Sequence, residues 1–128
     1  MNMMIRRAAF SEELASLIRR LFPKSEPLFT DKDVYFVAEE KGGVIGFVHL
    51  ILKENAVLLQ GIGVEPEWRE RGVGSRLLDS AVRFCDAKRM DIFLKVKPSN
   101  PALNLYHKKG FTLKKIKDVY VLEKKRMT

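Results

Sequence analysis

The order of apolar and polar positions along the chain alternates between patterns typical of strands and of helices. Residues 3–9 suit a short strand, and Ser11 follows as a candidate N-cap for a helix. The apolar positions of that helix recur at helical spacing: Leu14, Leu17, Ile18 and Leu21. Two prolines then predict a loop over residues 22–33. Such a loop is expected to border a substrate site.

The middle of the chain predicts an antiparallel meander. Residues 34–38 and 44–52 are rich in β-branched and aromatic side chains, and two glycines between them suit a tight turn. A second turn at residues 53–55 leads into a third strand of this meander at residues 56–64.

A long helix and a crossover follow the meander. The apolar face of the helix contains Val73, Leu77, Leu78, Ala81, Val82 and Cys85. A strand at residues 92–96 comes next, and a right-handed crossover places it parallel to residues 56–64.

The last quarter of the chain predicts a short helix and a hairpin. Residues 102–109 suit a helix that stops at Gly110. The hairpin strands are expected at residues 111–116 and 119–122, with the turn near Lys117 and Asp118, and residues 123–128 are expected to fray.

Length and charge limit the possible functions. The chain has 128 residues, which predicts one domain over residues 1–128, and 46% apolar residues are enough for a core. Its net charge of +8 points to an anionic partner, either nucleic acid or a phosphorylated cofactor.

The composition also indicates the compartment. Cys85 is the only cysteine, and with His49 and His107 it cannot make a zinc cluster, so no metal is expected. The longest uncharged stretch, residues 42–52, is shorter than the roughly 18 apolar residues that span a bilayer. Charges near the start of the chain argue against a signal peptide. We therefore expect a cytoplasmic protein with no membrane partner.

The most informative segment lies between the third meander strand and the long helix. Gly72 and Gly74 stand at the helix start, where the backbone can approach a ligand and unpaired N–H groups favour an anion. Three arginines add positive charge, which suits a pyrophosphate: Arg69, Arg71 and Arg76. No Walker loop is present, and the position in the chain does not fit a dinucleotide fingerprint.

Two motifs resemble those of the GNAT superfamily of acetyl-CoA-dependent N-acetyltransferases. Residues 69–74, Arg-Glu-Arg-Gly-Val-Gly, are similar to its Arg/Gln-x-x-Gly-x-Gly/Ala signature, and residues 105–111 are similar to its Leu-Tyr-x-x-x-Gly-Phe motif. The resemblance implies an α/β single domain with flanking helices. It also implies a mixed central sheet of about six to seven strands, with a splayed fourth and fifth strand pair.

The resemblance also implies a donor site for acetyl-CoA. The end of the third meander strand would contact the pantetheine arm, and the glycine loop would bind the pyrophosphate. These positions are Ile62, Gly63, Val64, Arg69, Glu70, Arg71, Gly72, Val73, Gly74 and Ser75. Gly61 and Gly63 would help the strand leave its neighbour.

Tyr106 corresponds to the family's tyrosine that protonates the departing thiolate, and its alternative role is that of an aromatic anchor. Asn104 matches an asparagine that binds the cofactor arm in some relatives, and Asn100 is the rival for that role.

The general base is the part of the pattern that this sequence does not match. Gln60 and Lys95 occupy the two positions where relatives carry a glutamate. The other candidates are His49, Glu39 and Glu40, or a water held by Gln60. An amino terminus with a pKa near 8 is partly neutral at working pH, so a dedicated base is not essential.

The resemblance therefore predicts an N-acetyltransferase that moves the acetyl group from acetyl-CoA directly to a primary amine in a ternary complex. The acceptor is a protein N-terminus, a lysine, a polyamine or a small-molecule amine. The alternatives are a CoA-binding sensor without catalysis and, ranked below it, a basic nucleic-acid-binding module. The state of assembly is expected to be a monomer or a homodimer.

Overall fold

A computed structural model of the chain describes residues 3–116 and 119–127. The turn expected near Lys117 and Asp118 lies outside the described residues. In chain order the elements are β1 (Met4–Ala8), α1 (Glu12–Leu21), β2 (Asp33–Glu40), β3 (Gly43–Leu52), β4 (Ala56–Val64), the 3-10 helix η1 (Pro66–Trp68), α2 (Val73–Ala87), β5 (Asp91–Val96), α3 (Leu103–Lys108), β6 (Thr112–Ile116) and β7 (Tyr120–Lys124).

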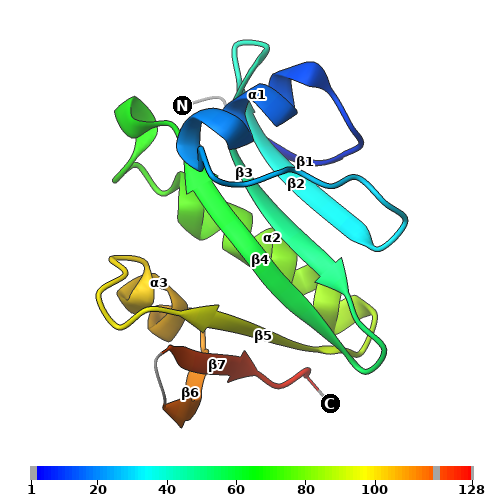
Figure 1. The fold of residues 1–128 in the computed structure, drawn as a ribbon, viewed down its shortest axis with the longest axis vertical. Helices are drawn as coiled ribbons and strands as arrows, with labels where there is room; N and C mark the ends of the chain where they lie inside the picture. Colours follow the sequence, from blue (N-terminus) through cyan, green and yellow to red (C-terminus); the bar gives the residue numbers. More distant parts are fainter. Residues whose placement is uncertain (1–2, 117–118, 128) are drawn as a thin grey trace.

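The strands form one mixed seven-stranded sheet in the order β1-β2-β3-β4-β5-β7-β6 (Figure 1). Strands β4 and β5 run parallel, and the other neighbouring pairs run antiparallel. The predicted meander, crossover and terminal hairpin are confirmed. Strands β4 and β5 can run parallel because α2 makes the crossover between them.

Helix α1 covers one face of the sheet. The Ser11 Oγ accepts a hydrogen bond from the Leu14 N–H at 3.1 Å, which confirms the predicted N-cap. The apolar stripe of α1 packs on side chains of β2 and β3 in a core of Leu14, Leu17, Ile18, Tyr35, Val37, Val44 and Phe47. The Glu13 carboxylate also accepts a 3.0 Å hydrogen bond from the Val44 N–H, which joins the helix start to β3.

Helix α2 covers the opposite face and forms the larger core with the sheet. Leu77, Leu78 and Ala81 of its apolar stripe are fully buried there. Leu105 and Tyr106 of α3 pack into the same core. None of the helices within residues 3–116 and 119–127 combines the length and apolar character needed to cross a bilayer.

The prediction that residues 123–128 fray is wrong for its first two residues. Strand β7 extends to Lys124, with Glu123 paired to Phe93 and Lys124 paired to Ile92 of β5. Backbone pairing with β5 holds these charged residues in the sheet, although their side chains carry no apolar signal. Beyond the strand, the Asp91 carboxylate accepts a 2.8 Å hydrogen bond from the Arg126 N–H.

Candidate active site

The central feature of the site is the divergence of β4 from β5. The two strands pair only from Ala56–Leu58 to Asp91–Phe93, and their carboxyl ends then separate, as Figure 1 shows. Along the other edge of β4, His49 pairs with Gly61 while the next residue, Leu50, pairs with Leu59. Gln60 is therefore the extra residue of a β-bulge, which bends β4 where the separation begins. The predicted splay of the fourth and fifth strands is confirmed.

The two glycines of β4 meet different surroundings. Gly63 is crowded, because a Cβ placed there would lie 2.9 Å from Leu21 Cδ1 and 3.0 Å from atoms of Phe22 and Phe47. Gly61 is open, because a Cβ there would meet no atom within 4 Å. The end of α1 therefore closes over Gly63 and leaves the surface at Gly61 free for a ligand.

The loop between β4 and α2 ends in an uncapped helix start. Gly72 is the N-cap of α2 with φ +83°, and it provides no side-chain hydrogen bond. The first-turn N–H groups of Val73, Gly74 and Ser75 therefore have no side-chain cap, and the helix dipole adds positive potential behind them. A Cβ at Gly72 would meet open space, so the backbone is accessible to a ligand. This arrangement fits a phosphate group.

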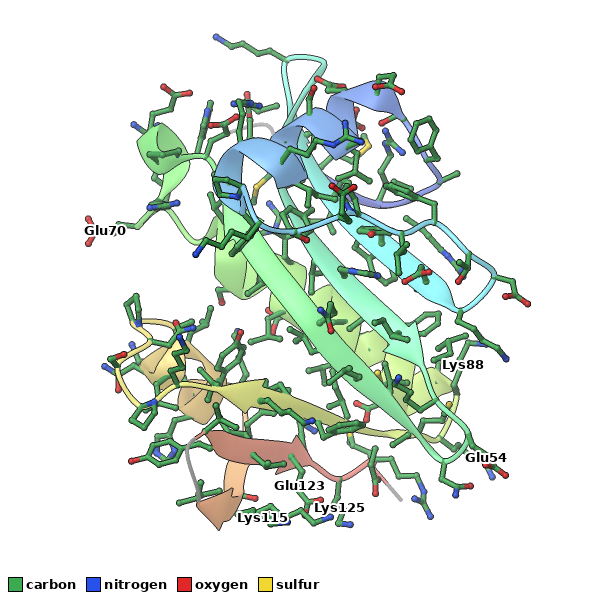
Figure 2. All side chains as sticks on the ribbon, viewed as in Figure 1. Glu54, Glu70, Lys88, Lys115, Glu123 and Lys125 are labelled. Carbon is green, nitrogen blue, oxygen red and sulfur yellow. The ribbon has the colours of Figure 1, made fainter. Side chains whose placement is uncertain are left out.

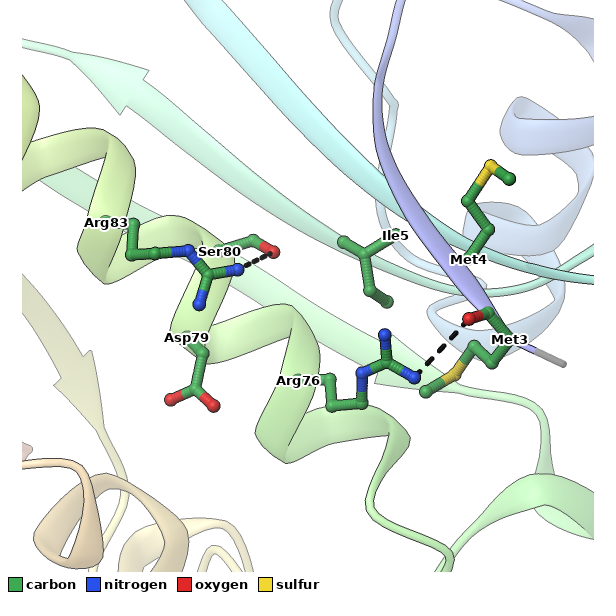
Figure 3. A pocket seen from close by; sticks show the side chains of 7 residues that line it. All are labelled: Met3, Met4, Ile5, Arg76, Asp79, Ser80 and Arg83. Atoms are coloured by element: carbon green, nitrogen blue, oxygen red, sulfur yellow. Dashed lines mark hydrogen bonds between the residues drawn. The ribbon is translucent and has the colours of Figure 1, made fainter. Parts of the chain in front are cut away.

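The three arginines of this region point in different directions. Arg69 lines the cleft, and its Nε donates a 3.0 Å hydrogen bond to the Val64 carbonyl. Arg71 lies over the Trp68 ring, with its Cζ 5.1 Å from the ring centroid, and is not among the residues that line the cleft. Arg76 points toward β1, where it donates to the Met3 carbonyl at 3.4 Å (Figure 3). The structure thus directs one arginine of the three into the cleft.

A cleft of about 860 Å³ joins these parts. Its lining includes nine of the positions predicted to bind the donor, namely Ile62, Gly63, Val64, Arg69, Glu70, Gly72, Val73, Gly74 and Ser75. Figure 2 shows Glu70 projecting from the edge of the molecule. The predicted Asn104 is exposed on α3 and is not among the lining residues, whereas Asn100 is.

Tyr106 belongs to α3 and lines the cleft from that helix. It is 5% exposed, and burial raises its pKa to about 12. Its ring makes an edge-on contact with Phe111, with centroids 5.7 Å apart. The phenol therefore keeps its proton at neutral pH at the edge of the cleft.

The candidate bases lie at different places. Gln60 and Lys95 line the cleft. His49 is buried beside Asp33, with 2.6 Å between Nε2 and Oδ1, and it is not among the cleft residues. Glu39 is ion-paired with Arg6, and Glu40 is buried. The structure therefore brings neither of these glutamates nor His49 to the cleft.

Sequence reasoning did not assign Leu21 and Phe22 individually to the lining, whereas the charge of Lys108 or Lys109 was expected to attract the 3′-phosphate of the donor. Leu21 and Phe22, at the end of α1, form one wall, and Lys108 of α3 lies on another. The only sequence signal for the wall was the proline-containing loop that follows α1, because a helix pattern does not show which strand its last turn will contact.

Comparison with known proteins agrees with the fold. The mixed sheet with a divergent parallel pair, covered by helices on both faces, defines a domain of the acetyltransferase type. The sequence model described as acetyltransferase (GNAT) domain matches residues 31–113. The chain belongs to the GNAT acetyltransferase family.

Relatives match parts of the chain. An uncharacterized N-acetyltransferase of Methanocaldococcus jannaschii is 30% identical over 95 residues, which cover 67% of this chain and 42% of that protein. The human cysteine-rich protein 2-binding protein is 36% identical over 66 residues, 52% of this chain and 8% of the human protein. The chain therefore spans less than half the length of these two relatives.

Solved structures share the whole fold. The ribosomal-protein-S18-alanine N-acetyltransferase from Escherichia coli has a TM-score of 0.81 at 17% identity, over 98% of this chain and 96% of that one. The PaiA N-acetyltransferase from Thermoplasma acidophilum, in complex with coenzyme A, has a TM-score of 0.79 at 19% identity, over 98% and 99% of the two chains. At these identities the similarity concerns the fold.

Proposed function

We propose that this protein transfers an acetyl group from acetyl-CoA directly to a primary amine while both substrates are bound. The observation that carries the proposal is the divergence of β4 and β5 beside the uncapped N-terminus of α2. A gap between strands with an anion site at its edge suits a long donor that carries a pyrophosphate. Bound acetyl-CoA supplies an activated thioester carbonyl.

The loop and the start of α2 would hold the pyrophosphate. The N–H groups of Val73, Gly74 and Ser75 are free to donate, and Arg69 adds a positive charge that its bond to the Val64 carbonyl keeps in place. The positive φ of Gly72 turns the chain into the helix without a side chain in the way.

The backbone of β4 would stabilise the charge that develops on the thioester oxygen. From Leu59 to Val64 the strand pairs with β3 on one edge, but on the other edge it has moved away from β5. N–H groups on that free edge can donate to an oxygen as negative charge grows on it.

Tyr106 would protonate the departing thiolate. Its raised pKa, due to burial, keeps the phenol protonated, and its position in the cleft lining gives it access to the bound donor. Gln60 would orient a water that accepts the proton of the amine. Acceptor amines with a pKa near 8 are partly neutral, so weak assistance of this kind is sufficient.

Calorimetry with coenzyme A tests the donor site. Gly72→Asp places bulk and negative charge at the α2 start and is expected to lower CoA affinity at least about tenfold, from the loss of helix-terminal and charge-assisted contacts. Gly42→Asp is the matched control, because Gly42 also has a positive φ of +80° and open space around it, but lies in the β2–β3 turn. Equal affinities for the two variants would contradict the assignment.

Thioester consumption with a panel of amines tests catalysis. The panel contains a peptide N-terminus, a lysine side chain, a polyamine and a small-molecule amine. Acetyl transfer to one of them supports the proposal. The alternative, a CoA-binding domain without transfer, is favoured by the presence of Gln60 and Lys95 at the expected base positions. It predicts CoA binding without consumption on any of the four.

A further inference from the structure

We infer that the acceptor amine carries a carboxylate close to it, and that Lys95 binds this carboxylate; the inference rests on the proposed acetyl transfer. Lys95 is an exposed residue of β5 that lines the cleft. It lies at the part of β5 that has separated from β4, which is where the two substrates would meet.

Strand alternation places Lys95 on the face of the sheet that α1 covers. Its neighbours Leu94 and Val96 are buried in the core under α2, so the Lys95 side chain points to the other face. The His49 ring stacks on Tyr35, which belongs to the core under α1, so Gly61, the β4 partner of His49, opens on this same face. Phe22 also borders the cleft there. This side of the cleft therefore has a cation, an open floor and an apolar wall.

The donor phosphates have an anion site of their own at the uncapped start of α2. The start of α2 packs against the face that α2 covers, where Val64 and Val73 belong to the core, and Arg69 donates to the Val64 carbonyl at the end of β4. Lys108 also lines the cleft, from α3. The Lys95 side chain points to the face opposite α2, so we assign it to the acceptor and not to the donor phosphates.

Carboxylates are scarce along the cleft. Among the described residues that line it, Glu70 is the only acid, and it lies at the edge of the molecule in the loop before α2. A polyamine or a lysine-rich acceptor would therefore approach Lys95 with no acidic group to offset the repulsion. An acceptor with a carboxylate near its amine gains an attractive pair instead.

Two kinds of acceptor share this chemistry, and matched pairs of amines separate them. One pair is a peptide with Asp as its second residue and the same peptide with Asn. The other pair is a free amino acid and its amide, and spermidine serves as the polycation. In low salt we expect the carboxylate member of at least one pair to have a kcat/KM higher by up to about fivefold, the range for a partly exposed ion pair. The pair that shows the preference identifies the source of the carboxylate.

Variants at one position assign the preference to Lys95. Lys95→Gln is expected to abolish the preference, and Lys95→Glu is expected to reverse it. Lys97→Glu is the matched control, since Lys97 is also exposed but is not among the cleft residues. The inference is overturned if spermidine or the neutral members are preferred, if Lys97→Glu acts as strongly as Lys95→Glu, or if Lys95→Gln weakens CoA binding instead.

Equilibrium binding separates this inference from the proposed function. Calorimetry with the same peptides and CoA-saturated protein needs no turnover. Preferential binding of the Asp peptide, lost in Lys95→Gln, supports the inference even where no acetyl group is transferred, and in that case the proposed catalysis alone fails. Transfer to both peptides at equal rates and with equal affinity overturns the inference and leaves the proposed function in place.

Discussion

Tyr106 combines packing and chemistry in one residue. Its ring contacts Phe111 and belongs to the larger core, while its position in the cleft lining makes the phenol available for proton transfer. Burial raises its pKa to about 12, which favours the protonated form that a proton donor needs.

We expect Tyr106→Phe to lower turnover on an identified amine by about 10²- to 10⁴-fold, the range for one general acid, with little change in CoA affinity. The ring packing is kept, so the thermal midpoint serves as the control for folding. Undiminished turnover, in an assay where acetyl transfer limits the rate, would leave Tyr106 with a packing role alone.

Cys85, unlike Tyr106, is buried away from the cleft. It is 1% exposed on α2, and burial raises its pKa to about 12. A thiol in this state is a poor nucleophile, and it lies outside the cleft lining. Direct transfer between the bound substrates is therefore consistent with the surroundings of this cysteine.

At the scale of elements, the end of α1 and strand β4 depend on each other. The Leu21 and Phe22 side chains rest on Gly63, and Phe22 meets the Phe47 ring edge-on at a centroid distance of 6.0 Å. The missing side chain at Gly63 therefore lets α1 form one wall of the cleft.

We expect Gly63→Ala to lower the free energy of unfolding by roughly 1–3 kcal/mol, the cost of adding a methyl group to a packed site. The neighbouring change Gly61→Ala is the control, since its Cβ meets nothing within 4 Å. Denaturant unfolding of both variants measures the difference. Equal stabilities would show that α1 moves away at little cost.

A partly buried polar network, centred on Asp33 and His49, holds the loop between α1 and β2. The Asp33 carboxylate accepts hydrogen bonds from the Thr30 N–H at 2.9 Å and the Thr30 hydroxyl at 2.6 Å. It also accepts from His49 Nε2, because an ionised carboxylate has no proton to donate. The His49 ring stacks on Tyr35 with centroids 4.1 Å apart, and the Tyr35 hydroxyl donates to the Leu28 carbonyl at 2.8 Å.

This network predicts loss of stability in acid. Burial lowers the pKa of His49, and Asp33 offsets only part of that effect. Burial also acts to raise the pKa of Asp33, but the hydrogen bonds from Thr30 and His49 outweigh it and lower the value. For both groups the unfolded chain takes up protons at a pH where the folded chain does not, so acid favours unfolding.

Denaturant unfolding between pH 8 and pH 3 checks this expectation. The His49 contribution is complete above its unfolded pKa of about 6.5 and is lost as the pH falls below that value, while the Asp33 contribution is lost below about 3.9. His49→Gln retains an N–H donor but has no titratable group, so it should remove the loss of stability below about pH 6.5. A wild-type stability that is constant from pH 8 to pH 5 would contradict the assignment.

At the scale of the whole molecule, the chain has a net charge of +8 and an organised site for the donor phosphates at the start of α2. Several other cations are engaged in ion pairs on the surface, among them Arg6 with Glu39 and Arg20 with Glu65. We therefore expect nucleic acid to bind weakly, with an affinity that falls steeply with salt and no sequence preference.

A gel-shift titration at physiological salt, with and without saturating acetyl-CoA, measures this binding. Competition by acetyl-CoA for part of the surface is the expected result. Tight, sequence-dependent binding that acetyl-CoA leaves unchanged would favour a nucleic-acid-binding role over the acetyltransferase role.

The sequence by itself determined the order of the elements, the Ser11 cap, the apolar faces of α1 and α2, and the loop with Gly72 at the start of α2. These features depend on residues a few positions apart: a capping oxygen near its N–H group, a helical repeat, or a glycine where φ is positive. Local spacing is visible in a single chain.

Tertiary structure alone decided where the long side chains point and how the strand ends pair. Arg71 stacks on Trp68, Arg76 turns toward β1, and His49 is held by Asp33 from the neighbouring strand. The β5 pairing also keeps Lys124 in the sheet. Each outcome depends on a partner that folding brings close, because a flexible charged side chain has no direction of its own until packing and hydrogen bonding select one.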